Sequence, residues 1–249
     1  MEKAEGIEKL FFDFSSESRL GIIRELTQQN LRMNELGRKL DLTPTEVFRQ
    51  LQRLAEASVV RKLPDGSYEI TNYGKLTLQL LPPLEFTFRH KEYFLTHDVS
   101  RIPYTFVNRM GELLKGTLCM DTIETLNRAG QIFNEAENYA WLMGEKSLDS
   151  FDPAISGRGT PGVRFRFLFY EHPKSNPLRG PAPRQAPLIE KRTLTTIPGI
   201  ILCTEKEAGV CLPSTEGRMD YTGFYSKDPV FVAWARDLFL HCWDLGQQC

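Results

Sequence analysis

Short amphipathic segments fill the first part of the chain. In 20–27 (LGIIRELT) the apolar residues recur at helical spacing, and 33–40 shows the same pattern, so two short helices are predicted. A third helix begins at Thr43, a good N-cap residue. Pro44 suits the first helical position, and Glu46 stands where a capping box places its acid.

A β-hairpin is predicted after this third helix. Segments 59–63 (VVRKL) and 67–71 (SYEIT) are strand-like, and the Pro-Asp-Gly sequence between them is typical of a turn. This predicted order of elements is that of a winged helix-turn-helix: two helices, a turn, a capped helix and a hairpin. There the second helix of the pair enters the DNA major groove and the hairpin lies over the backbone. We therefore assign residues 1–75 to such a domain.

The third helix has an apolar and a polar side. Val47, Leu51 and Leu54 cluster on one side of a helical wheel. Arginine and glutamine form paired hydrogen bonds with guanine and adenine edges, so the opposite side and the hairpin are predicted to bind DNA. The predicted DNA-binding residues are Thr45, Arg49, Gln52, Arg53, Arg61 and Lys62. A solvated helix face and a winged helix that docks only protein remain as alternatives.

A nearly uncharged segment follows the hairpin. Residues 74–88 (GKLTLQLLPPLEFTF) contain Pro82 and Pro83, which a helix interior does not tolerate, so 76–100 is assigned to a linker with dimerisation helices. The segment and the N-terminus hold more apolar residues than one small domain needs, and we expect part of them between the subunits of a homodimer. Burial within one chain is the alternative. These residues are Leu10, Phe11, Phe12, Phe14, Leu76, Leu78, Leu80 and Leu81.

Helical and strand patterns alternate in residues 101–249. A capped helix is predicted to begin after Asp121, with Ile123, Leu126, Gly130 and Phe133 along its apolar face, and a last helix begins after Asp228. Strands are predicted at 139–143, 163–170, 193–197, 199–204 and 209–212. The expected class is α+β overall: an N-terminal winged helix-turn-helix followed by an α/β sandwich that senses an effector.

The strand at 163–170 (VRFRFLFY) carries the candidate ligand site. Its strict alternation places the aromatic residues on one face and Arg164 and Arg166 on the other. Two guanidinium groups on one face suit an anionic small-molecule effector, and Arg218 and Tyr221, in a glycine-flanked loop, are a candidate rim. The effector itself is unknown, and a solvent-facing strand is the alternative.

Composition adds limits to this picture. The 249 residues are 41% hydrophobic and 25% charged with a net charge of -1, as in an ordinary globular protein. The stretch from Arg32 to Lys62 is locally basic, with seven basic and four acidic residues. We expect neither a membrane span nor a secretory signal. The five scattered cysteines lack a CxxC pair, which predicts reduced thiols in a cytoplasm, even for Cys203 and Cys211 on the predicted hairpin.

No enzyme, cofactor or metal site is predicted. Glycine-rich nucleotide loops, HExxH and GxSxG are absent from the sequence. His172-Pro173-Lys174 matches the start of a phospholipase-D-like motif, but Arg179 stands where the motif needs an aspartate, and there is no second copy. The histidines are dispersed, as expected of structural residues. An enzyme acting on a phosphorylated small molecule remains the rival hypothesis.

Three stretches resemble a known family. The winged-helix segment TPTEVFRQLQRLAEASVVRKLPDGSYEITNYGK resembles ArsR-type regulators of archaea. FLTHDVSRIP, MDTIETLNRAGQIFNEAENYAWLM and GFYSKDPVFVAWARDLFLHCW resemble the archaeal methanogenesis and filamentation regulatory proteins. The resemblance implies a dimeric, ligand-responsive transcriptional regulator that binds specific double-stranded DNA.

Overall fold

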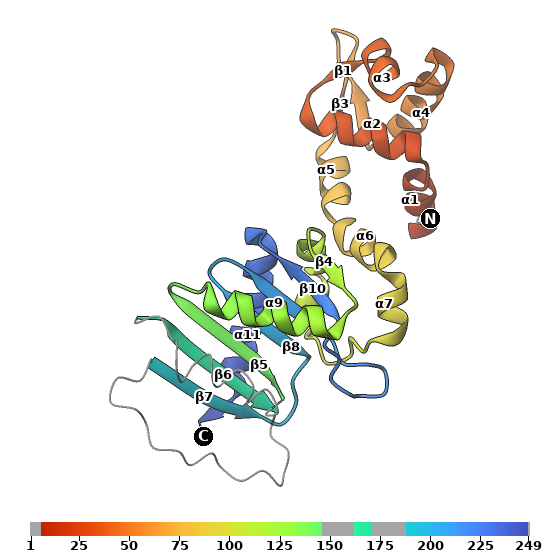
Figure 1. The fold of residues 1–249 in the computed structure, drawn as a ribbon. Helices are drawn as coiled ribbons and strands as arrows, with labels where there is room; N and C mark the ends of the chain where they lie inside the picture. The colour runs from red at the N-terminus through yellow and green to blue at the C-terminus, as the bar shows by residue number, and fades with distance from the viewer. Residues whose placement is uncertain (1–5, 146–161, 171–187, 249) are drawn as a thin grey trace, which may run out of the picture. The chain divides into compact units, whose positions relative to one another are not determined.

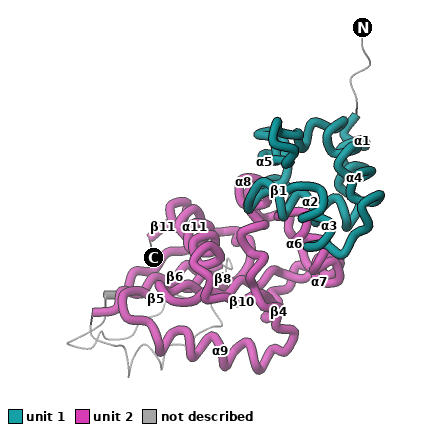
Figure 2. Tube along the Cα trace, turned by 90° about the horizontal axis from the view of Figure 1, so that it is seen from above, with its two compact units in different colours: residues 1–81 teal, residues 82–249 magenta. Residues whose placement is uncertain are grey.

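The chain divides into two compact units. The computed structural model describes residues 6–145, 162–170 and 188–248. The units are Met1–Leu81 and Pro82–Cys249, coloured separately in Figure 2. The linker expected at 76–100 is therefore split between the units. Most of it belongs to the second, because Phe86 and Tyr93 are buried in that unit's core.

The first unit contains the predicted winged helix-turn-helix. Its elements in chain order are α1 (Ile7–Phe14), α2 (Glu17–Gln28), β1 (Leu31–Arg32), α3 (Met33–Leu40), α4 (Pro44–Glu56), β2 (Val60–Lys62), β3 (Ser67–Ile70) and α5 (Asn72–Gln79). The strands form a sheet in the order β1-β3-β2, with both pairings antiparallel. Ile22, Leu36, Leu51 and Leu54, from the three helices of the motif, are almost completely buried in one core.

The predicted start of α4 is confirmed in atomic detail. The Thr43 hydroxyl accepts a hydrogen bond from the Glu46 amide at 3.3 Å. In return, the Glu46 carboxylate accepts one from the Thr43 amide at 3.0 Å. This reciprocal pair satisfies backbone donors that the helix itself leaves without partners. The cap thus determines where α4 begins and which residues its first two turns present.

The second unit is built on a mixed eight-stranded sheet. Its strand order is β11-β7-β6-β5-β8-β9-β10-β4, in which the β5–β6 and β6–β7 pairs are parallel and the others antiparallel. The strands are β4 (Thr117–Cys119), β5 (Tyr139–Glu145), β6 (Arg164–Tyr170), β7 (Leu188–Leu194), β8 (Ile200–Thr204), β9 (Ala208–Cys211), β10 (Gly223–Ser226) and β11 (Gln247–Gln248). The helices are α6 (Pro82–Arg89), α7 (Lys91–Thr96), α8 (Tyr104–Val107), the 3₁₀ helix η1 (Met110–Leu113), α9 (Thr122–Asn134) and α11 (Pro229–Leu245).

Helices cover both faces of this sheet. Trp234 and Phe239 of α11 pack on one face, in a core shared with Phe86 of α6. Ile132 and Phe133 of α9 pack on the other, as the opposite positions of α9 and α11 in Figure 1 show. The predicted α+β class, with a winged helix followed by a sheet between helices, is confirmed.

One local prediction is confirmed and another needs correction. Pro82 and Pro83 do not lie in a helix interior: α5 ends before them, and they form the first turn of α6, where the missing amide hydrogens have no helical partner to lose. In α9 the predicted face is wrong at Ile123, which is 72% exposed, and at Leu126. The buried face of α9 instead consists of Thr125, Ala129, Ile132 and Phe133.

Candidate nucleic-acid interface

The outward face of α4 is mostly polar and exposed within its unit. Val47, Leu51 and Leu54 are at most 1% exposed and anchor the helix in the core. All six residues predicted to bind DNA are exposed, four on α4 and two on β2. The core contacts of α4 therefore determine which side chains its outer face presents.

Several of these side chains already have partners. The Gln52 amide donates a hydrogen bond to the Glu56 carboxylate at 3.1 Å. The Arg53 guanidinium lies 5.8 Å from the ring centre of Phe12 on α1, a cation–π contact. Gln52 can hydrogen-bond a base only by leaving Glu56, so it is a weaker candidate for base reading than the sequence suggested, whereas Arg53 would give up only a ring contact.

Arg49 is the strongest candidate for base reading. Among the residues that the structure describes, no hydrogen bond or ion pair involves its guanidinium. Hydrogen bonds from the Thr43 hydroxyl and amide, with a smaller contribution from the nearby Arg49 charge, hold the pKa of Glu46 below its usual value. Arg49 and Thr45 lie in the first two turns of α4, the part of a recognition helix that contacts base edges.

The hairpin presents its basic residues on a strand, away from its tip. Arg61 forms an ion pair with Glu69 on β3, and the Lys62 ammonium lies 5.9 Å from the ring centre of Tyr68. The turn itself carries an acidic residue, Asp65, whose carboxylate accepts hydrogen bonds from the Ser67 amide at 3.0 Å and hydroxyl at 2.7 Å. Lys62 is thus the better placed of the two cations for a phosphate.

An exposed phenylalanine was missed by the sequence reasoning. Phe48 on α4 is 57% exposed, although its neighbour Val47 is completely buried. A helical wheel places it beside Gln52, one turn further along the helix. Its apolar character gave no reason to include it among polar DNA contacts, yet its position on the wheel could have identified it.

The four candidate ligand residues of the second unit are not brought together. Arg166 is bound on three sides: to Glu190 at 2.6 Å, and to the rings of Trp141 and Trp243 at 5.3 and 5.0 Å. Arg164 shares that face of the sheet, which packs against α11, but it is exposed.

Tyr221 packs with the core on the opposite, α9 face, and Arg218 pairs with Glu216 at the surface. Tyr221 lines a cavity of about 20 Å³ together with Cys211 and Tyr225. That volume suits one water molecule. The geometry therefore provides no formed anion site from this set.

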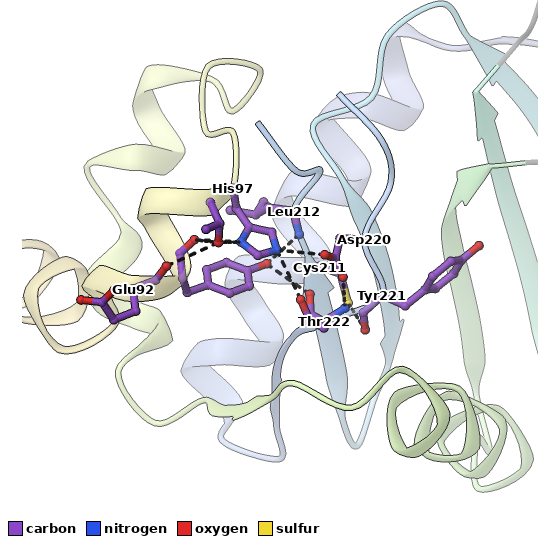
Figure 3. A network of polar contacts seen from close by, with 9 residues as sticks. Glu92, His97, Cys211, Leu212, Asp220, Tyr221 and Thr222 are labelled. Atoms are coloured by element: carbon purple, nitrogen blue, oxygen red, sulfur yellow. Dashed lines mark hydrogen bonds and ion pairs between the residues drawn. The ribbon is translucent and has the colours of Figure 1, made fainter. Parts of the chain in front are cut away.

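A buried polar network connects α7 to the loop before β10 (Figure 3). The His97 ring stacks on Tyr93 at 3.7 Å, and its Nε2 lies 3.3 Å from the Thr222 hydroxyl and 3.5 Å from the Asp220 carboxylate. The Tyr93 hydroxyl accepts from the Leu212 amide at 3.0 Å, and burial raises its pKa. These groups satisfy one another, as expected for a structural histidine.

The described residues form neither a Cys203–Cys211 pair nor a metal-binding cluster. Cys203 and Cys211 do not face each other, because Cys203 belongs to the α11 side of the sheet and Cys211 to the α9 side. Across the described ranges there is no group of three histidine, cysteine or acidic residues able to hold a metal.

His172 and Lys174, the phosphodiesterase-like fragment, lie outside the described residues. The described helices include none that is long and apolar enough to span a membrane.

The comparisons with known proteins give only distant likenesses. The sequence matches no protein-family model and no curated protein. TrmBL2, an archaeal chromatin protein with a novel mode of DNA binding, is 14% identical over 98% of each chain, with a TM-score of 0.38. NucT from Helicobacter pylori is 11% identical over 54% of this chain and 99% of its own, with a TM-score of 0.39. Likenesses this distant do not decide a family or a function.

Proposed function

We propose that this chain is a transcriptional regulator that binds specific double-stranded DNA through α4 and the β2–β3 hairpin. The observation that supports the proposal is the accessible first half of α4, with Arg49 unpaired, beside a hairpin that carries Lys62. A helix of this kind reads bases in the major groove while the hairpin contacts phosphates. The resemblance to archaeal regulators agrees with this role and stays a prediction.

Two variants test the two kinds of contact. Duplexes are first selected from a random library with the full chain, and affinities are then measured by fluorescence anisotropy at several salt concentrations. Arg49→Ala should cost about 1–3 kcal/mol on the selected duplex and relax sequence preference. Lys62→Ala should weaken all duplexes alike and reduce the salt slope by about one.

A matched control separates these effects from the loss of one positive charge. Lys91 is an exposed lysine on α7 in the second unit, and Lys91→Ala should leave both affinity and salt slope unchanged. Failure to enrich any duplex, or equal losses for all three variants on every sequence, would contradict the proposal.

We also propose that the regulator acts as a homodimer, since two-fold related half-sites require a two-fold related protein. Phe11 and Phe12 on α1, Leu76 on α5 and Leu80, directly after α5, are at least half exposed, which leaves them available to a second subunit. Phe14, by contrast, is buried in the core of its own unit. Light scattering at micromolar concentration, with and without DNA, tests this proposal, and a monomer in both conditions contradicts it.

A response to a small-molecule effector completes the proposal. The second unit is much larger than DNA binding requires, and a ligand that prefers one conformation would change operator affinity reciprocally. Anionic metabolites can be screened by thermal shift, followed by Arg164→Ala on any compound that stabilises the chain. Turnover of that compound would instead favour an enzyme.

A further inference from the structure

An exposed aromatic side chain stands among the polar residues of α4. Phe48 is 57% exposed, whereas the α4 residues that anchor the helix are buried. It lies three residues after Thr45 and four before Gln52, so these three side chains follow one another along the outward side. Much of the surface of this residue is therefore in contact with water within its own unit, and burial in a partner would remove that unfavourable exposure.

The surrounding residues favour a base edge as that partner. Phe48 occupies the same two turns as Arg49, the unpaired cation, where a recognition helix approaches the bases. The next polar side chain along this line, Gln52, is hydrogen-bonded to Glu56. Unlike the Gln52 side chain, the phenyl ring can therefore contact DNA without first breaking a hydrogen bond.

We propose that Phe48 determines specificity by packing against the 5-methyl group of a thymine in the major groove. This inference rests on the proposed function, because it requires α4 to enter the groove. In the major groove, thymine alone of the four bases presents a methyl group, and apolar side chains contact it there. A phenyl ring can therefore select an A·T pair without forming a hydrogen bond.

The test removes the methyl group from the DNA. Each thymine of a selected duplex is replaced in turn by deoxyuridine, which pairs identically but lacks the 5-methyl group. Wild-type protein should lose about fourfold in affinity at the contacted thymine, the effect of one buried methyl-sized group. Phe48→Ala should bind more weakly to the parent duplex and show no further loss at that thymine.

Controls identify the source of the loss. Phe88 on α6 is 82% exposed in the second unit, and Phe88→Ala should keep the wild-type response to deoxyuridine. Phe48→Gln keeps a long side chain but removes the apolar surface, so it should likewise show no further loss at that thymine, whatever hydrogen bonds its amide forms with a base edge. It also serves if the alanine variant folds poorly.

The outcomes separate this inference from the proposed function. A double-mutant cycle that combines a Phe48 variant with a deoxyuridine replacement measures the interaction free energy between the ring and the methyl group. A non-zero interaction free energy at one thymine supports the inference. If wild type and both Phe48 variants respond alike to deoxyuridine at every position, the inference is overturned while DNA binding stands. A loss of dimer mass in the Phe48 variants, without a change in thymine preference, would assign the ring to a protein contact and overturn it as well. If no duplex is enriched, the proposed function itself fails.

Discussion

Replacing Arg166 with alanine should destabilise the second unit. The side chain extends from β6 toward α11 and contacts Trp141, Trp243 and Glu190. Alanine removes all three contacts. Trp141 then loses the Arg166 cation, whereas Trp243 keeps a cation–π contact with Arg192, whose guanidinium lies 4.7 Å from its ring centre. This substitution distinguishes an arginine that stabilises the fold from one that serves to bind a ligand.

The contacts determine the expected size of the effect. Each cation–π contact in a partly exposed setting contributes about 0.5–1 kcal/mol. The ion pair adds roughly 0.2–1 kcal/mol, because Glu190 is half exposed and water screens the charges. Together these contacts predict a loss of about 1–3 kcal/mol in the free energy of unfolding.

Urea denaturation followed by tryptophan fluorescence measures this loss. The three tryptophans of the chain, at positions 141, 234 and 243, all lie in the second unit, so their signal reports the unfolding of that unit. With a urea dependence of about 2 kcal/mol per molar, the midpoint should fall by roughly 0.5–1.5 M. The midpoint is compared rather than the signal amplitude, since Arg166 lies against two of the fluorophores.

Two further variants make the test specific. Arg164→Ala, on the same face of the same strand, should shift the midpoint little because that side chain is exposed. Arg166→Lys keeps the charge but loses the planar stacking and should give an intermediate loss. An unchanged midpoint for Arg166→Ala, or equal shifts for Arg164→Ala and Arg166→Ala, would refute the reasoning and return Arg166 to the candidate anion site.

Two other predictions concern the cap of α4 and the buried thiols. Thr43→Ala should destabilise the first unit by about 1 kcal/mol and raise amide hydrogen exchange in α4, whereas Thr45→Ala, outside the cap, should change exchange little. Burial raises the pKa of Cys203 to about 12, so iodoacetamide at pH 8 should label Cys119 first and Cys203 only after unfolding. The same shift contributes stability that is complete below pH 9, the pKa of the unfolded thiol, and is lost as pH rises toward 12. Labelling of Cys203 as fast as Cys119, or exchange in α4 that Thr43→Ala leaves unchanged, would contradict these accounts.

Local chemistry made the winged helix predictable. Thr43, Pro44 and Glu46 specify a helix start through contacts within four residues, and the structure places the cap where the sequence predicted it. Strand β1 was not predicted, because two residues carry no periodic signal. It forms through pairing with β3, which places Leu31 opposite Tyr68. Such a strand depends on a partner far along the chain.

In the second unit, strand β7 could not be recognised from the pattern of hydrophobic and polar residues alone. Strand β7 contains Glu190, Lys191 and Arg192 and is too polar to be recognised as an interior strand, yet it pairs with β6 and β11. Its pairing opposes Arg166 with Glu190, so the charge of one strand is balanced by the next. A single-strand pattern contains no information about that neighbour.

The same limit explains the candidate anion site. The alternation in β6 correctly placed Arg164 and Arg166 on one face, but it could not show that Trp243, about eighty residues later in the chain, would cover that face. An anion at Arg166 must displace Glu190 and compete with two aromatic rings, so its binding would cost the stability that these contacts provide. Arg164 has no such cost, because its side chain is already exposed. Any anion that bound this strand would therefore meet less competition at Arg164 than at Arg166.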